Sequence, residues 1–221
     1  MNKTVMVTGA NKGIGLEFCI FYKSQGADVI AVCRSPSEKL LALDVQVIDE
    51  VDVSSEQGIE RLKQAVSGRT IDILINNAGI FSNQTLGELN FTEVSRQFEV
   101  NAVGPLKVTH ALLPQLDRGA KVALITSRMG SVADNTSGAY YGYRMSKAAL
   151  NAAGMSLACD LKPKGVAVAI LHPGFVQTSM VGYAGDISPQ TAAERLAQRI
   201  EELTIDTTGT FWHSNGTVLP W

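Results

Sequence analysis

The sequence predicts an α/β fold in which a doubly wound, seven-stranded parallel sheet carries helices on both faces. Short runs rich in Val and Ile alternate with longer stretches of helical periodicity along the whole chain. The runs are continuously apolar, which is typical of strands that are buried on both faces of a parallel sheet. Right-handed crossovers between such strands give the doubly wound arrangement. We expect a single domain over residues 1–221, with no linker or internal repeat.

The expected elements follow one another in strict alternation. The expected strands are the apolar runs 4–8, 28–33, 45–48, 71–75, 121–126, 166–171 and, more weakly, 209–213. The expected helices are 15–25, 55–66, 92–116, 145–161 and 189–203. After the second strand, the stretch 34–43 leaves room for only one or two helical turns. Parallel strands need such crossovers, because a tight hairpin cannot join them.

Composition and charge exclude several classes of protein. Lys plus Arg total 19 against 21 Asp plus Glu, so the formal net charge is -2 and no basic field exists to bind nucleic acid. Three cysteines without a C-x-x-C pair, and scattered histidines, argue against disulfides and metal sites. No signal-like segment and no run of about 18 apolar residues occurs. We therefore expect a cytoplasmic protein that binds no nucleic acid, membrane or metal.

The predicted helix 145–161 is unusually rich in small residues, with Ala, Gly or Ser on nearly every face. Small residues permit close packing on both sides of the helix. One side must lie on the sheet, and the other either meets a second subunit, in a homodimer or homotetramer, or packs within the monomer.

A glycine-rich loop joins the first strand to the first helix. Its glycines have the spacing G-x-x-x-G-x-G, and no Gly-Lys-Ser/Thr of a P-loop follows them. Glycines allow a pyrophosphate to approach the backbone, and the helix N-terminus supplies N–H groups and positive potential. The expected phosphate-binding residues are Gly9, Asn11, Lys12, Gly13, Ile14 and Gly15.

The end of the second strand indicates which dinucleotide binds. An Asp or Glu usually stands here to bind the ribose 2′-hydroxyl, whereas this chain has Arg34. Together with Lys12, Arg34 favours the 2′-phosphate of NADP(H) over NAD(H). The alternative is that Arg34 is simply a solvated residue after a strand.

Three tyrosines lie within four positions, and only one has a lysine four residues later. Tyr143 is followed by Lys147, whereas Tyr140 and Tyr141 are followed at this spacing by Arg144 and Met145. Residues i and i+4 share one face of a helix, and a nearby ammonium lowers the pKa of a phenol. Tyr143 is therefore the candidate acid, and the other two tyrosines are candidates for packing or for the wall of the pocket.

At this point the sequence resembles the short-chain dehydrogenase/reductase family from about residue 4 to the C-terminus, and most closely its carbonyl reductases of the sniffer and C-factor type. The resemblance rests on "TGANKGIG" (8–15), "VDV" (51–53), "NNAG" (76–79), "VNAVGP" (100–105), "ITSRMGS" (125–131), "YRMSK" (143–147) and "HPGFVQT" (172–178). It implies a single Rossmann-type domain that reduces aldehyde or ketone carbonyls with NADPH, or oxidises the alcohols in reverse.

The resemblance also implies roles for individual residues. Ser127 would bind the substrate carbonyl, Tyr143 would donate the proton, and Lys147 would bind the ribose of the cofactor. Asn101 would hold a water that links Lys147 to solvent. The remaining cofactor contacts would come from Asp52, Val53, Asn77, Ala78, Gly79, Pro173, Gly174, Val176 and Thr178.

Two features depart from the usual pattern of the family. The gap of 16 residues from Ser127 to Tyr143 is longer than in many members, so Ser131 competes for the same role. We favour Ser127 because it lies at the end of the fifth strand. The segment after "HPGFVQT" is short, which predicts an open pocket. Candidate substrate contacts are Met129, Tyr140, Phe175, Met180 and Tyr183.

We therefore predict an NADPH-dependent carbonyl reductase that acts on a small carbonyl substrate. The alternative is an NADP(H)-binding regulatory protein of the C-factor type with little turnover. A sugar-nucleotide epimerase would share the Tyr–Lys pair, but the chain after Pro173 is too short for its substrate domain.

Overall fold

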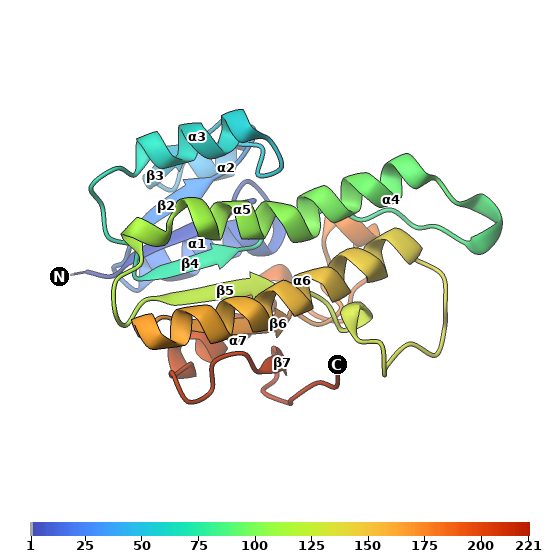
Figure 1. Ribbon diagram of the computed structural model, residues 1–221. Coiled ribbons are helices and arrows are strands. Elements are labelled where there is room, and N and C mark those ends of the chain that lie inside the picture. Colours follow the sequence, from blue (N-terminus) through green and yellow to red (C-terminus); the bar gives the residue numbers. More distant parts are fainter. Residues whose placement is uncertain (1) are drawn as a thin grey trace.

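A seven-stranded parallel sheet forms the centre of the molecule in a computed structural model that describes residues 2–221 (Figure 1). Its strands are β1 (Thr4–Thr8), β2 (Asp28–Val32), β3 (Gln46–Ile48), β4 (Ile73–Asn76), β5 (Lys121–Ile125), β6 (Ala167–His172) and β7 (Phe211–His213). Their order is β3-β2-β1-β4-β5-β6-β7, and every neighbouring pair is parallel. The predicted doubly wound Rossmann fold is confirmed, and the order of strands reverses between β1 and β4.

Helices cover both faces of this sheet and bury two separate cores. The helices are α1 (Gly13–Ser24), α2 (Glu38–Leu41), α3 (Glu56–Ala65), α4 (Phe91–Phe98), α5 (Gly104–Ala111), α6 (Tyr141–Leu161) and α7 (Pro189–Glu202). In Figure 1, α3, α5 and α6 lie in front of the sheet, and α1 and α7 lie behind it. Strand side chains alternate between the two cores, as on β1, where Met6 faces one core and Val5 and Val7 face the other.

The helix predicted over 92–116 is continuous from Phe91 to Ala111, contains a π-helical turn, and ends before a separate short turn at Leu113–Gln115. A π-helical turn at Glu99–Val103 separates α4 from α5. Such turns contain one extra residue and are frequent at functional sites. Here the turn contains Asn101, which is fully buried. The predicted helix is therefore present, but the sequence pattern did not reveal the π turn within it or its earlier end at Ala111.

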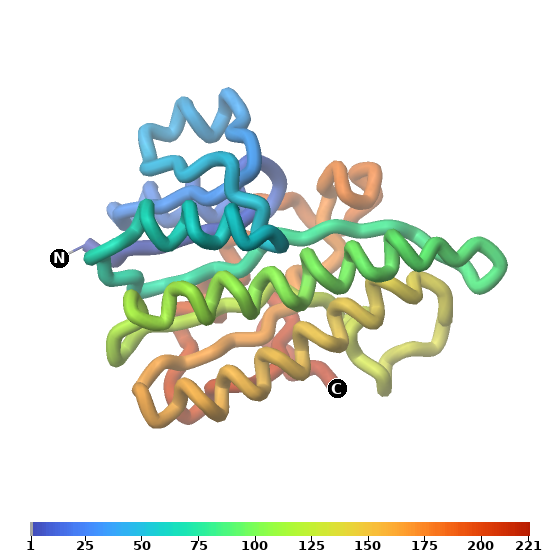
Figure 2. Tube along the Cα trace, turned by 45° about the horizontal axis from the view of Figure 1, so that its top comes forward, coloured from blue at the N-terminus to red at the C-terminus, as the bar shows by residue number. Residues whose placement is uncertain are grey.

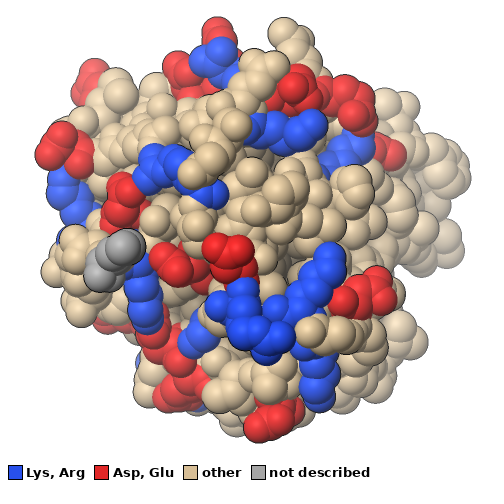
Figure 3. All heavy atoms as spheres, turned by 60° about the vertical axis from the view of Figure 1, so that its left-hand side comes forward, with Lys and Arg blue, Asp and Glu red and all other residues tan. Residues whose placement is uncertain are grey.

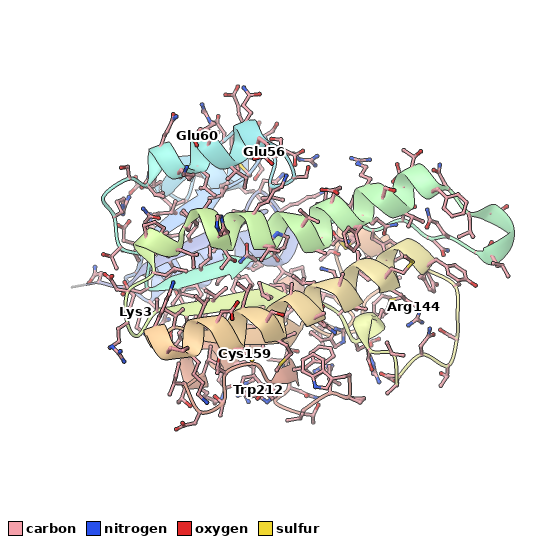
Figure 4. All side chains as sticks on the ribbon, viewed as in Figure 1. Lys3, Glu56, Glu60, Arg144, Cys159 and Trp212 are labelled. Atoms are coloured by element: carbon pink, nitrogen blue, oxygen red, sulfur yellow. The ribbon has the colours of Figure 1, made fainter. Side chains whose placement is uncertain are left out.

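Helix α6 begins at Tyr141, four residues before the predicted start, so that Tyr143 and Lys147 both lie within it. The backbone just before it is left-handed, with φ of 64°, 53° and 55° at Gly138, Ala139 and Tyr140. Arg144 hydrogen-bonds this turn, since its guanidinium donates to the carbonyl of Gly138 at 3.3 Å (Figure 4). The first part of helix α6 packs against α4 and the π turn that follows it (Figure 2).

The surface carries both signs of charge. Acidic and basic side chains are interspersed over the face in Figure 3, apart from one group of basic side chains in its lower half. Among the helices of residues 2–221, none is long and apolar enough to cross a membrane. Within the same residues, no group of three or more His, Cys, Asp or Glu side chains is arranged to hold a metal ion.

Candidate active site

A cleft of about 530 Å³ opens at the carboxyl ends of the central strands, where the strand order reverses. It extends from Arg34, which follows β2, to Tyr143 and Lys147 on α6. The predicted cofactor and catalytic residues that line it are Gly9, Asn11, Lys12, Gly13, Ile14, Arg34, Asp52, Val53, Asn77, Ala78, Gly79, Tyr143, Lys147, Pro173 and Thr178. Segments far apart in the sequence thus meet in one cavity.

The glycine loop at the floor of this cleft is shaped by close backbone approaches. Gly9 and Gly13 have φ of 66° and 55°, a conformation that other residues rarely adopt. A Cβ on Gly9 would lie 2.8 Å from the Cα of Ala78. The side chain of Asn77 donates to the carbonyl of Thr8 at 3.0 Å and so fixes the loop against the end of β4. A side chain at Gly9 would therefore collide with Ala78, and Gly13 has a backbone conformation that favours glycine.

The N-terminus of α1 faces the same loop and has the properties of an anion site. Side chains of Ser37, Ser55, Asn90 and Ser188 cap the N-termini of α2, α3, α4 and α7, respectively. At α1, the capping position is Lys12, which makes no such hydrogen bond. The first N–H groups of α1 therefore remain available to a phosphate, and the positive end of the helix attracts one. The cleft fits a dinucleotide cofactor on these grounds.

Two exposed cations lie at the end of the cleft near β2. Arg34 and Lys12 both line the cavity, and neither makes an ion pair with a carboxylate within residues 2–221. Asp52 lies nearby, and its carboxylate accepts hydrogen bonds from the Ser54 hydroxyl at 2.6 Å and the Ser54 N–H at 2.9 Å. The Ser54 hydroxyl is the main cause of a lowered Asp52 pKa, and Arg34 contributes to it. This end of the cleft is suited to an additional negative group.

The opposite end holds the Tyr–Lys pair. The Nζ of Lys147 lies 5.8 Å from the centre of the Tyr143 ring and donates to the carbonyl of Ile125 at 3.0 Å. Burial raises the pKa of Tyr143 to about 12, and a hydrogen bond with the Ser127 hydroxyl acts in the opposite direction. Burial also lowers the pKa of Lys147 to about 8. The spacing from Lys147 predicts a lowered pKa for Tyr143, whereas in the structure burial raises it.

The two candidate serines lie in different surroundings. Ser127 follows β5 by two residues, contacts the phenol of Tyr143, and accepts a bond from the N–H of Met129 at 3.1 Å. The hydroxyl of Ser131 instead accepts a bond from the N–H of Asp134 at 3.1 Å. The geometry favours Ser127 as the partner of Tyr143.

Asn101 lies behind the cleft and does not line it. Its side chain accepts from the N–H of Ile80 at 2.8 Å and donates to the carbonyl of the same residue at 2.9 Å. It also donates to the hydroxyl of Ser146 at 3.0 Å. Asn101 therefore ties the segment after β4 to α6.

Several other predicted residues lie outside the lining of the cleft. Gly15 is buried beneath the loop, where a Cβ would lie 2.6 Å from Nδ2 of Asn77, so its contribution is close packing. Predicted residues that do not line the cleft are Ser127, Gly174, Val176, Met129, Tyr140, Phe175 and Tyr183, whereas Met180 does line it. Lining residues that the sequence analysis missed are Val32, Cys33, Ser35, Val51, Ile80, Val100, Ile125, Thr126 and Ser179. Most of these residues lie at the end of a strand or just after it, and this position in the sequence could have predicted that they line the cleft.

The loop after β6 is supported from its outer side. Ser214 donates its hydroxyl to the carbonyl of Pro173 at 2.9 Å and its N–H to the carbonyl of His172 at 2.8 Å. A Cβ on Gly174 would lie 3.7 Å from the ring of His213. The segment after β7 therefore braces this wall of the cleft.

Comparison of the sequence with known proteins agrees with this geometry. The model of the short chain dehydrogenase family matches residues 3–202. The chain is 41% identical over 224 residues to 1-hydroxy-2-glutathionyl-2-methyl-3-butene dehydrogenase of Rhodococcus sp. (strain AD45), with 99% of each chain covered. It is 45% identical over 154 residues to C-signal of Myxococcus xanthus, covering 68% of this chain and 93% of that protein.

Solved structures show the same architecture over the whole chain. Carbonyl reductase Sniffer of D. melanogaster superposes with a TM-score of 0.91 at 28% identity and full coverage of both chains. The NADPH-bound carbonyl reductase from chicken fatty liver gives a TM-score of 0.90 at 27% identity, covering 100% of this chain and 99% of that one. The predicted resemblance is confirmed, and the chain belongs to the short-chain dehydrogenase/reductase family of oxidoreductases.

Proposed function

We propose that this protein is an NADPH-dependent carbonyl reductase in which Tyr143 is the proton donor. The observation that supports it best is that Tyr143 and Lys147 line the same cleft as the glycine loop and the uncapped N-terminus of α1. A binding site for a dinucleotide and a candidate acid therefore share one cavity. NADPH bound there would supply the hydride.

Tyr143 and Lys147 line the cleft, and Ser127 and Asn101 lie next to it, so we infer the following roles. The Tyr143 phenol, whose pKa is raised by burial, holds its proton at neutral pH and delivers it to the carbonyl oxygen as that oxygen gains charge. The Ser127 hydroxyl, next to the phenol, hydrogen-bonds the same oxygen. Lys147 holds the ribose hydroxyls of the cofactor and supports Tyr143 from the wall of the cleft. Asn101 fixes the segments that carry these groups.

Replacement of the phenol tests this assignment directly. We expect Tyr143→Phe to reduce turnover by at least about 100-fold, because loss of general acid catalysis costs about 10²–10⁴-fold, while NADPH binding stays near that of the parent. Tyr141→Phe is the matched control, since it removes the same hydroxyl from an exposed ring two residues away. NADPH consumption is followed spectrophotometrically with aldehydes, ketones, diketones and quinones. Parental turnover in Tyr143→Phe would exclude Tyr143 as the acid.

The proposed preference for NADPH rests on the free cations Arg34 and Lys12. One charge-assisted hydrogen bond to the 2′-phosphate contributes about 1.5–3 kcal/mol, or roughly 10- to 150-fold in affinity. Arg34→Asp is therefore expected to lower the ratio of kcat/KM for NADPH over NADH by at least about tenfold. Arg61→Asp, an exposed arginine on α3, should leave the ratio unchanged. Equal efficiencies of the parent with the two cofactors would contradict the role of Arg34.

The outer rim of the cleft favours an apolar substrate. Met180 lines the cavity and is 44% exposed, and Phe175 and Tyr183 on the same short segment are also exposed. We infer that an aldehyde or ketone with an apolar substituent binds here. The Rhodococcus relative is named for a glutathionyl-substituted alcohol. A glutathione conjugate of an unsaturated alcohol therefore belongs in the assay, run in the oxidative direction with NADP⁺ and NAD⁺.

The second candidate function is an NADP(H)-binding regulator, and the identity of 45% to C-signal favours it. A regulator would bind NADP(H) in the same cleft but would not need Tyr143. Tight dinucleotide binding, measured by calorimetry, with no turnover over the full panel of carbonyls and alcohols would support the regulator over the enzyme.

A further inference from the structure

Two buried amide side chains hold the segment that follows β4, at Ile80 and at Ser82. Asn101 binds both the N–H and the carbonyl of Ile80, at 2.8 and 2.9 Å. One helical turn earlier, the side chain of Gln97 accepts from the N–H of Ser82 at 3.0 Å. Asn101 and Gln97 are both 0% exposed. Two buried amides on one helix therefore fix the backbone on either side of residue 81.

Phe81 lies between the two fixed residues and projects its ring toward α6. Its ring centroid is 5.0 Å from that of Tyr143, with the planes at 80°, an edge-to-face pair. It is also 5.8 Å from the ring of Tyr140, which precedes α6 in the left-handed turn. The ring of Tyr143 is therefore packed against a side chain whose backbone cannot shift freely.

The same Gln97 also lies against the first turn of α6. A Cβ on Gly142 would lie 2.6 Å from Nε2 of Gln97 and 3.0 Å from the Cα of Val94, so α6 and α4 are in close contact at this point. Deeper in the helix, the hydroxyl of Ser146 donates to the carbonyl of Tyr143 at 2.8 Å and accepts from Asn101. The backbone of Tyr143 and the backbone of Phe81 are thus held by the same stretch of helix.

We propose that Phe81 is a positioning residue for the phenol of Tyr143, and that Gln97 keeps Phe81 in place through its bond to Ser82. The proposal rests on the proposed function, since it assumes that Tyr143 delivers the proton. An edge-to-face contact restricts rotation of the Tyr143 ring about its Cα–Cβ and Cβ–Cγ bonds. The hydroxyl then stays beside Ser127 before substrate arrives, and such orientation is worth large factors in rate.

Replacement of Phe81 by Leu tests the contact itself. We expect kcat to fall about 10- to 100-fold with the carbonyl compound that the parent reduces fastest, while the Kd for NADPH changes less than about twofold. Phe18→Leu is the matched control, because Phe18 also stacks beside a tyrosine, Tyr22, but in the core behind the sheet. It should lower the melting temperature without lowering kcat. A Phe81→Leu variant with parental kcat would overturn the proposal.

Gln97→Met tests the clamp, since methionine has similar volume but cannot bind Ser82. We expect Gln97→Met to lower kcat and to leave KM unchanged. In the double variant Gln97→Met/Phe81→Leu, we expect kcat to be close to that of Phe81→Leu alone. If Phe81→Leu changes KM in proportion to substrate size and leaves kcat intact, Phe81 is a wall of the substrate pocket, and the proposal is wrong. The proposal is also wrong if the losses in kcat caused by Gln97→Met and Phe81→Leu are additive in free energy.

A third variant separates this proposal from the proposed function. If Tyr143→Phe abolishes turnover but Phe81→Leu leaves kcat unchanged, Tyr143 is assigned correctly as the acid and only the positioning role of Phe81 is wrong. When Tyr143→Phe retains turnover, both fail. When both lose activity, Phe81→Leu added to Tyr143→Phe should cause no further loss in residual turnover, since the contact matters only through the phenol. A further loss would contradict the proposal.

Discussion

His172 at the end of β6 makes the stability of the fold depend on pH. The side chain is 6% exposed, and its Nδ1 has no hydrogen-bond partner within residues 2–221. Its ring stands edge-on to that of His213, with centroids 4.8 Å apart. Burial is the main cause that lowers the pKa of His172 to about 3, and the nearby His213 and Arg128 contribute to the same shift. The folded protein therefore holds His172 neutral under conditions in which the unfolded chain protonates it.

The size of the effect follows from these pKa values. Between the folded pKa near 3 and the unfolded value of 6.5, the unfolded chain binds more protons, so stability falls as the pH falls. From about pH 7.5 to about pH 5.5, the free energy of unfolding should decrease by about 1.4 kcal/mol through this one group. The decrease would continue at about 1.4 kcal/mol per pH unit until the pH approaches 3.

Urea unfolding of the parent and of His172→Gln at the two pH values measures this contribution. The variant has no imidazole at this position, so it should lose about 1.4 kcal/mol less than the parent over the same interval. His110→Gln is the control for loss of a histidine side chain, because His110 is exposed on α5. Equal losses in the parent and in His172→Gln would refute the reasoning.

Two further predictions concern the walls of the cleft. Gly15→Ala should destabilise the protein by about 1–3 kcal/mol and prevent NADPH binding, because the new methyl group overlaps Gly9 and Asn77. Thermal melts would measure the loss of stability, and calorimetry would measure NADPH binding. Gly87→Ala is the control, and it should change neither quantity because the space around Gly87 is open. Ser214→Ala removes the bond to Pro173, so we expect the Kd for NADPH to rise about 2- to 10-fold. The Kd for 2′,5′-ADP, which lacks the nicotinamide, should stay the same. If NADPH and 2′,5′-ADP both bind more weakly, the effect of Ser214 is not confined to the wall at Pro173.

The strands were predictable because their signal is local. Each run of Val and Ile must fill a position that is buried on both faces, and β1, β2 and β6 therefore appear within one or two residues of their predicted ends. The glycine loop was predictable for a similar reason. Gly9 and Gly13 adopt positive φ, which the sequence signals through glycine itself.

The approach to α6 was not predictable, because no local preference produces it. Ala139 and Tyr140 adopt left-handed φ although neither is glycine, which costs roughly 1–2 kcal/mol per residue. The N–H of Tyr140 donates to the carbonyl of Gln84 at 2.7 Å, and its ring packs on Phe81. Both partners come from the segment after β4, some 55 residues earlier. Tertiary contacts thus stabilise a backbone that the sequence around it disfavours.

Asn101, in the π turn at Glu99–Val103, uses its side chain to hold neighbouring segments together. An asparagine amide has two donor hydrogens, and here both are used, one on the carbonyl of Ile80 and one on the hydroxyl of Ser146. Its oxygen accepts the N–H of Ile80. The side chain therefore joins three elements and keeps no donor for a water. A water between Asn101 and Lys147 would therefore have to donate to Asn101, either to the second lone pair of its side-chain oxygen or to a main-chain carbonyl. The sequence identifies the residue, and the fold shows that its side chain ties the segment after β4 to α6.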